Sequence, residues 1–98
     1  MNAQNLAGLD LVIYSAPWCG DCRRLERWLR TESLSFPKVD IESDPKAADR
    51  LERETGKRAI PFVLVNGKDW VPGYHKELPS RFDPERFVQD VWNQANAN

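Results

Sequence analysis

The sequence has few of the features that would place this protein in a membrane, on nucleic acid or among disulfide-rich domains. Its 98 residues include two cysteines, one histidine and one methionine, and the net charge is -1. This charge provides no basic excess for nucleic acid and no acidic tail. No apolar run approaches the ~20 residues of a membrane-spanning helix. A chain of this length can bury a core without a disulfide, so the cysteine pair needs another explanation.

The first ten residues, MNAQNLAGLD, have neither a basic segment nor a long apolar core, so they do not form a signal peptide. We therefore expect a cytoplasmic protein. Thiols are kept reduced in the cytosol, where a close cysteine pair is more often catalytic or metal-binding than structural. No repeat, low-complexity segment or linker interrupts the chain, and we expect a single domain over residues 1–98.

Apolar runs and turn residues predict an α/β fold with a four-stranded mixed sheet flanked by helices. Strands are expected over residues 9–15, 37–41, 59–65 and 68–71. Helices are expected over about 19–31, from Ser43 or Asp44 to Gly56, and from Asp83 onward. The first two strands should be parallel, with a right-handed crossover, and Asn66-Gly67 predicts a hairpin between the last two. The last helix should bury Phe87, Val88, Val91, Trp92 and Ala95.

The two cysteines lie in the stretch APWCGDCRR, residues 16–24, where the first strand gives way to a helix. Cys19 would lie at the helix N-terminus, where free N–H groups and the helix dipole favour a thiolate. Cys22 lies one turn further along, at the edge of the apolar stripe, close enough to attack a mixed disulfide on Cys19. We therefore predict that Cys19 is the nucleophile and Cys22 the resolving thiol.

The charged neighbours of the pair act in opposite directions. Arg23 and Arg24 place positive charge near the sulfurs, whereas Asp21 places a negative charge between them. We expect Asp21 to disfavour the thiolates, unless its carboxylate points into water and has little effect. The arginine face of the same helix is most simply a solvated face, and docking of an acidic partner is the alternative.

Other roles for the cysteine pair remain open. A structural zinc site needs four ligands, and the pair with the lone His75 falls short of that number in one chain. His75 itself is expected to be a surface residue. Two chains together could supply four cysteines to an iron–sulfur cluster, and an inert disulfide is the third alternative.

Three blocks of the sequence resemble the glutaredoxin branch of the thioredoxin superfamily, in the family order. They are LVIYSAPWCGDCRRL, TGKRAIPFVLVNG and GYHKEL. The first block, followed by VDIESD, is similar to the mycoredoxins, which are actinobacterial relatives of glutaredoxins. The resemblance implies a thioredoxin-like β-α-β-α-β-β-α fold and a thiol-disulfide oxidoreductase that reduces mixed disulfides or protein disulfides.

The resemblance also implies a thiol-binding site beside the cysteines. Pro61 should be cis and face the pair, presenting the backbone of Ile60 to an incoming thiol or peptide. Trp18 could stack on a substrate or pack against the last helix, and Arg58 could meet a carboxylate or be an exposed loop residue. The family's Gly-Gly-x-x-Asp segment falls on Gly73, Tyr74 and Glu77.

The sequence departs from these families at three places. Ile13 stands where thioredoxins carry a buried acid, residues 15–18 lack the lysine of many glutaredoxins, and Tyr74 replaces the second glycine. The resemblance implies a monomer without a tightly bound cofactor, with glutathione, mycothiol or a similar thiol as co-substrate. A thioredoxin-reductase-dependent electron donor is the second interpretation, and an iron–sulfur scaffold is the third.

Overall fold

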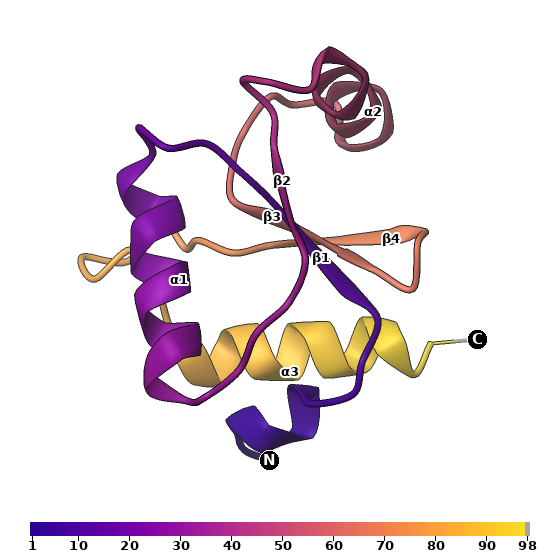
Figure 1. Cartoon of the computed structure of the whole chain (residues 1–98). Coiled ribbons are helices and arrows are strands. Elements are labelled where there is room, and N and C mark those ends of the chain that lie inside the picture. Colours follow the sequence, from indigo (N-terminus) through magenta and orange to yellow (C-terminus); the bar gives the residue numbers. More distant parts are fainter. Residues whose placement is uncertain (98) are drawn as a thin grey trace.

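Four strands form one mixed sheet in the computed structural model, which describes residues 1–97 (Figure 1). The elements in chain order are the 3₁₀ helix η1 (Ala3–Leu6), β1 (Leu11–Ser15), α1 (Gly20–Thr31), β2 (Lys38–Asp40), α2 (Pro45–Thr55), β3 (Phe62–Val65), β4 (Asp69–Pro72) and α3 (Pro84–Ala95). After η1, this is the predicted β-α-β-α-β-β-α order. None of the helices in the described part of the chain has both the length and the apolar character needed to cross a membrane.

The sheet has the strand order β2-β1-β3-β4. β1 and β2 run parallel, with Ile13 opposite Lys38, which confirms the predicted crossover through α1. β3 is antiparallel to both β1 and β4, with Tyr14 opposite Phe62 in the first of these pairs. Because β1 and β3 are antiparallel, the last residues of β1 and the first residues of β3 lie at the same end of the two strands.

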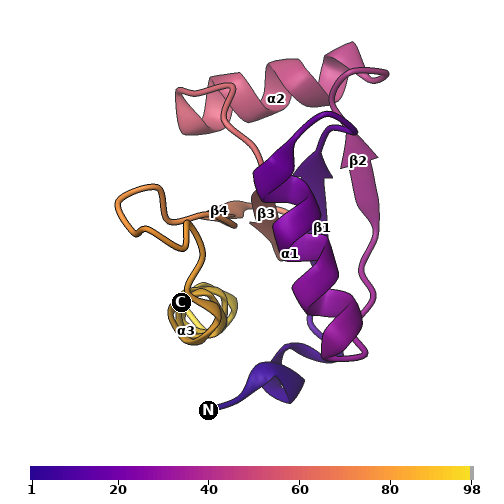
Figure 2. The same cartoon turned by 90° about the vertical axis from the view of Figure 1, so that its left-hand side faces the viewer.

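The helices cover the two faces of the sheet unequally. α1 and α3 pack on one face, where Leu25, Phe87 and Val91 are almost fully buried against β1, β3 and β4. α2 covers the other face through Ala47 and Leu51. Figure 2 shows α2 and α3 on opposite sides of the strands. Successive side chains of β1 point to opposite faces of the sheet, so this central strand contributes to the core under α1 and α3 and to the core under α2.

The turn residues identified in the sequence act as predicted. Asp44 caps α2 by accepting a hydrogen bond from the Ala47 N–H at 3.1 Å, and Gly56 ends that helix with φ of 78°. Asn66 and Gly67 have φ of 54° and 73°, the left-handed pair that a tight hairpin between β3 and β4 requires.

Two features differ from the sequence-based expectation. η1 was not expected, yet Ala3 and Leu6 are buried in the core beside α3. β3 begins at Phe62 rather than at residue 59, because Pro61 has no N–H to donate to a strand ladder. Residues 59–61 are left outside the sheet, where they can line a site.

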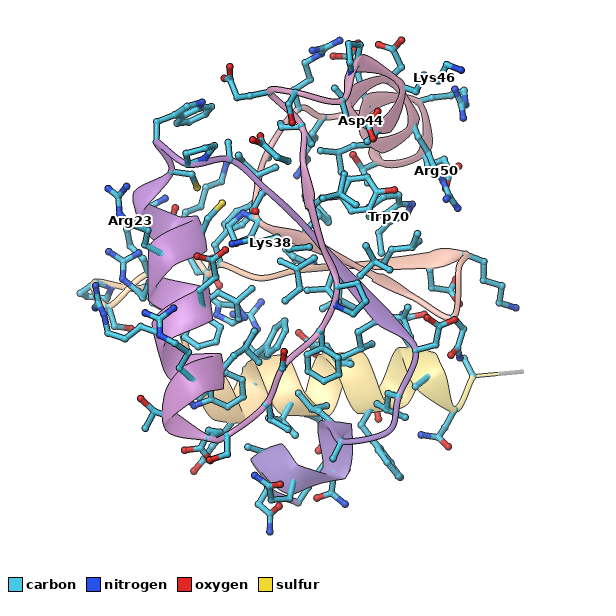
Figure 3. The ribbon with its side chains drawn as sticks, viewed as in Figure 1. Arg23, Lys38, Asp44, Lys46, Arg50 and Trp70 are labelled. Carbon is cyan, nitrogen blue, oxygen red and sulfur yellow. The ribbon has the colours of Figure 1, made fainter. Side chains whose placement is uncertain are left out.

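Trp70, on β4, closes the α2 side of the sheet. Its ring meets Tyr14 edge-on, with centroids 4.8 Å apart, and its indole N–H donates to Glu54 at 2.9 Å. The guanidinium of Arg50 lies 5.9 Å from the centroid of the indole ring, and Figure 3 shows the two side chains together between β4 and α2.

Of the two aromatic residues expected on the inner face of α3, Phe87 is buried and Trp92 is half-buried.

His75 is buried, with 2% of its surface exposed, so its expected surface position is wrong. Its Nδ1 accepts a hydrogen bond from the Asp83 N–H at 2.9 Å, and its ring stacks on Phe82 with centroids 5.8 Å apart. Nε2 has no partner. Burial lowers the pKa of His75 below its ordinary value, because charging this ring would remove the Asp83 contact and place a cation in the interior.

Stability should therefore decrease at mildly acidic pH. The unfolded chain takes up a proton at His75 near the ordinary pKa of about 6.5, whereas the folded chain takes it up only at lower pH. The stabilising difference is present above that pKa and is lost as the pH falls below it. We expect the Tm of the wild-type protein to fall more between pH 7.5 and 5.5 than that of His75→Gln. Equal decreases in thermal melts would contradict this assignment.

Candidate active site

The CxxC motif lies where β1 leaves the sheet and α1 begins. Cys19 is the N-cap residue of α1, with φ of -85° and ψ of 116°. Its Sγ accepts a hydrogen bond from the Cys22 N–H at 3.1 Å, as an N-cap side chain does. The same sulfur lies 3.8 Å from the carbonyl oxygen of Ile60. An N–H group of the first helical turn therefore points directly at the sulfur predicted to attack.

The two thiols have different surroundings. Cys19 is 6% exposed and lines a surface groove, whereas Cys22 is 1% exposed and does not line that groove. Burial raises the pKa of the Cys22 thiol, and its hydrogen bond to Cys19 raises it further. The two thiols therefore differ in exposure and surroundings, while their division into an attacking and a resolving cysteine remains a prediction.

The groove at Cys19 has a volume of about 430 Å³. Its lining residues come from the start of α1, from the segment before β3 and from the loop after β4. They are Trp18, Cys19, Gly20, Asp21, Arg58, Ala59, Ile60, Tyr74, Lys76 and Arg81. The Ile60–Pro61 peptide bond is cis, as the resemblance implied, and Pro61 is buried below the groove.

Trp18 and Arg58 also line a second groove of about 410 Å³, toward α2. Trp18 is 64% exposed, and its indole N–H donates to Glu42. It therefore does not pack on α3, and its ring is open to a substrate. Arg58 donates to Glu52 at 2.6 Å and to Asp49 at 3.3 Å. A substrate carboxylate at Arg58 would have to compete with these two partners.

Gly73 lets the loop after β4 approach the cysteine helix closely. A Cβ atom at this position would lie 2.8 Å from Leu25 Cδ2 and 3.1 Å from Pro61 Cγ. The next residue, Tyr74, is 9% exposed and packs edge-on against Phe62, with centroids 6.0 Å apart. Tyr74 thus forms part of the groove wall at the position of the family's second glycine.

Glu77 lies outside the groove, and its carboxylate pairs with Arg86. Its predicted part in binding a thiol remains a prediction. Within residues 1–97, no group of three or more His, Cys, Asp or Glu side chains is placed to hold a metal ion.

The surroundings of the Asp21 carboxylate differ most from those that the sequence predicted. Its carboxylate accepts hydrogen bonds from Arg81 Nε at 2.9 Å and from Arg81 Nη2 at 2.7 Å, and it also pairs with Arg24. It is therefore neither an isolated charge between the sulfurs nor a side chain in water. The hydrogen bonds from Arg81 hold the pKa of Asp21 below its ordinary value. Sequence reasoning missed Arg81, which lies 60 residues away in a loop without a recognisable motif.

A four-stranded sheet with a CxxC motif at the N-terminus of its first long helix and a cis-proline opposite defines the thioredoxin-like class. Within that class, the glutaredoxin family model matches residues 11–70. This match covers more than half of the chain, and the chain belongs to the glutaredoxin family.

Individual relatives include both glutaredoxins and a thioredoxin. A Mycobacterium tuberculosis protein named "putative glutaredoxin" is 37% identical over 54 residues, which are 54% of this chain and 64% of that protein. The chain thus spans slightly less than two thirds of that relative. Thioredoxin of Bacillus subtilis is 27% identical over 95% of this chain and 88% of its own length. The holo form of glutaredoxin C1 from Populus tremula x tremuloides superposes with a TM-score of 0.59 at 25% identity, covering 90% of this chain and 91% of that one.

Differential labelling should distinguish the two cysteines. At pH 7.5 we expect iodoacetamide to modify one thiol per chain, at Cys19, because burial keeps Cys22 protonated and only a thiolate reacts. Peptide mass spectrometry locates the label. Cys22→Ser should still be labelled, whereas Cys19→Ser should react at least about tenfold more slowly. Equal labelling of both cysteines would contradict the asymmetry.

Gly73→Ala should destabilise the protein. The added methyl group overlaps Leu25 and Pro61, and overpacking of this kind typically costs about 1–3 kcal/mol. Urea unfolding measures the loss. Gly20→Ala is the matched control, because a Cβ at Gly20 meets nothing within 4 Å. An equal change in both variants would show that the close approach at Gly73 is unimportant.

Proposed function

We propose that this protein is a dithiol-disulfide oxidoreductase that reduces mixed disulfides or protein disulfides. The observation that carries the proposal is the pairing of an N-capping Cys19 sulfur, open to a groove, with a buried Cys22 one turn along α1. A helix N-terminus stabilises a thiolate through its N–H groups and dipole. Membership of a family of thiol-disulfide oxidoreductases supports the same chemistry.

The reaction takes place in two exchanges. The Cys19 thiolate attacks one sulfur of the substrate disulfide, a Cys19–substrate disulfide forms, and the other sulfur leaves as a thiolate that takes up a proton. Cys22 then loses its proton and attacks the Cys19 sulfur. The second substrate thiol is released, and a Cys19–Cys22 disulfide remains. The substrate gains two electrons, which a small thiol or a reductase later restores to the protein.

The residues that line the groove favour an extended thiol or peptide as substrate. The Ile60 backbone can pair with an extended segment, as added strands do at open backbone, and Trp18 offers an exposed ring for stacking. Glutaredoxins use glutathione as co-substrate, and mycothiol is the alternative. Arg58 already pairs with Asp49 and Glu52. We propose that it releases these two carboxylates when it binds the carboxylate of a substrate.

Similarity to a thioredoxin favours a second candidate function. The match to the Bacillus subtilis protein extends over 95% of this chain, beyond the segment that matches the glutaredoxin model. On this alternative, a thioredoxin-reductase-type flavoprotein supplies the electrons, and Tyr74 occupies the space that a small thiol would need.

Trapping with Cys22→Ser tests the proposal. This variant retains the attacking Cys19 but cannot resolve a mixed disulfide, so it should accumulate one adduct per chain. We would incubate it with oxidised glutathione, oxidised mycothiol and a peptide disulfide, and record the intact mass. We expect an adduct that dithiothreitol removes, and none with Cys19→Ser.

Wild-type protein would be tested in parallel with NADPH and thioredoxin reductase. A thiol adduct without reductase turnover identifies the thiol-dependent reaction, whereas rapid reductase turnover without a thiol adduct supports the second function. Absence of both, together with a brown dimer after anaerobic purification, would overturn the oxidoreductase proposal and favour the iron–sulfur scaffold.

A further inference from the structure

An ion pair connects the loop after β4 to the centre of the CxxC motif. Both oxygens of Asp21 accept from the Arg81 guanidinium, at 2.9 and 2.7 Å, in the two-pronged arrangement that gives arginine its geometric specificity. The Asp21 side chain is 16% exposed and the Arg81 side chain 45% exposed, so the carboxylate is partly shielded from water while the guanidinium lies at the surface.

The backbone of the loop is arranged around Arg81. Arg81 has φ of 61°, a left-handed conformation that is uncommon for a side chain of this size. Its carbonyl accepts from the His75 N–H at 2.7 Å, and its N–H donates to the Leu78 carbonyl at 3.0 Å. The loop is thus closed on itself, and the guanidinium links it to Asp21 in the motif. Tyr74 and Lys76 on the same loop line the groove at Cys19.

We propose that Arg81 is a positioning residue with two effects on thiol chemistry at Cys19. Its charge offsets the Asp21 carboxylate beside the attacking sulfur, and its two hydrogen bonds hold the loop as a fixed wall of the substrate groove. The second effect rests on the proposed function, whereas the first concerns the reactivity of the thiol itself.

Several charged and titratable groups share the groove with Cys19 and Arg81. They are Asp21 on α1, Arg58 before β3, and Tyr74 and Lys76 on the loop. The Cys22 N–H donates to the Cys19 sulfur. Arg24 also pairs with Asp21, so loss of Arg81 leaves the carboxylate partly compensated. We therefore expect replacement of Arg81 to change the reactivity of Cys19 only moderately.

Four single variants and the double variant Arg81→Gln/Asp21→Asn separate the two effects. Arg81→Gln removes the charge and the paired hydrogen bonds, whereas Arg81→Lys keeps a positive charge without the planar, two-pronged geometry. Asp21→Asn removes the negative charge. Arg27→Gln is the matched control, because it removes an exposed arginine of α1 that has no ion pair within residues 1–97.

The first readout is the rate of Cys19 alkylation by iodoacetamide as a function of pH. We expect the midpoint to rise in Arg81→Gln and to fall in Asp21→Asn, because a nearby positive charge favours the thiolate and a negative charge disfavours it. The double variant should return close to the wild-type midpoint, and Arg81→Lys should stay close to it. Midpoints that move in the same direction in the two single variants, or no more than in Arg27→Gln, would overturn the charge effect.

The second readout is the single-turnover reaction of the reduced protein with a self-quenched peptide disulfide. Arg81→Gln, Arg81→Lys and Asp21→Asn should all raise the half-saturating peptide concentration severalfold, because each loosens the loop. Unchanged half-saturation in all three would overturn the positioning role. If Arg81→Gln does not fold, Asp21→Asn and Arg81→Lys still decide both effects. A wild-type protein that reduces no disulfide would refute the proposed function, while the alkylation midpoints would still test Arg81.

Discussion

The antiparallel pairing of β1 with β3 is the constraint on which the site depends. Tyr14 lies opposite Phe62, so the segment that follows β1 and the segment that precedes β3 lie at the same end of the two strands. Cys19 follows the first strand and Ile60 precedes the second, and this pairing brings the Cys19 sulfur to 3.8 Å from the Ile60 carbonyl oxygen. Residues 41 positions apart in the sequence meet because of a backbone ladder that contains neither of them.

Burial of α1 against the sheet then makes the two cysteines different. Cys22 is on the same side of the helix as Leu25 and Leu29, which enter the core, whereas Cys19 precedes the first turn and remains at the surface groove. A single amphipathic helix therefore supplies an accessible sulfur with N–H groups beside it and a buried sulfur within reach. The chemical asymmetry of the pair follows from helix geometry, without an additional acid or base.

Much of this could be predicted from the sequence because the signals were local. The N-cap at Asp44, the Asn66-Gly67 turn and the placement of Cys19 before a helix each follow from a few adjacent residues. Contacts between distant segments could not be predicted in this way. The pairing of Asp21 with Arg81 joins a helix to a loop that has no periodic pattern. The burial of His75 depends on Phe82 and on the start of α3, and a lone histidine gives no signal of such partners.

Both edges of the sheet leave little backbone available for pairing with another chain. The edge strand β2 has three residues, and the opposite edge strand, β4, has four and ends at Pro72. Short edge strands and a proline without an N–H are features that discourage edge-to-edge association. Strand addition at both edges is thus disfavoured, in contrast to the substrate pairing that we propose at Ile60. The proposed pairing would bring a substrate backbone next to the Cys19 sulfur, which lies 3.8 Å from the Ile60 carbonyl oxygen.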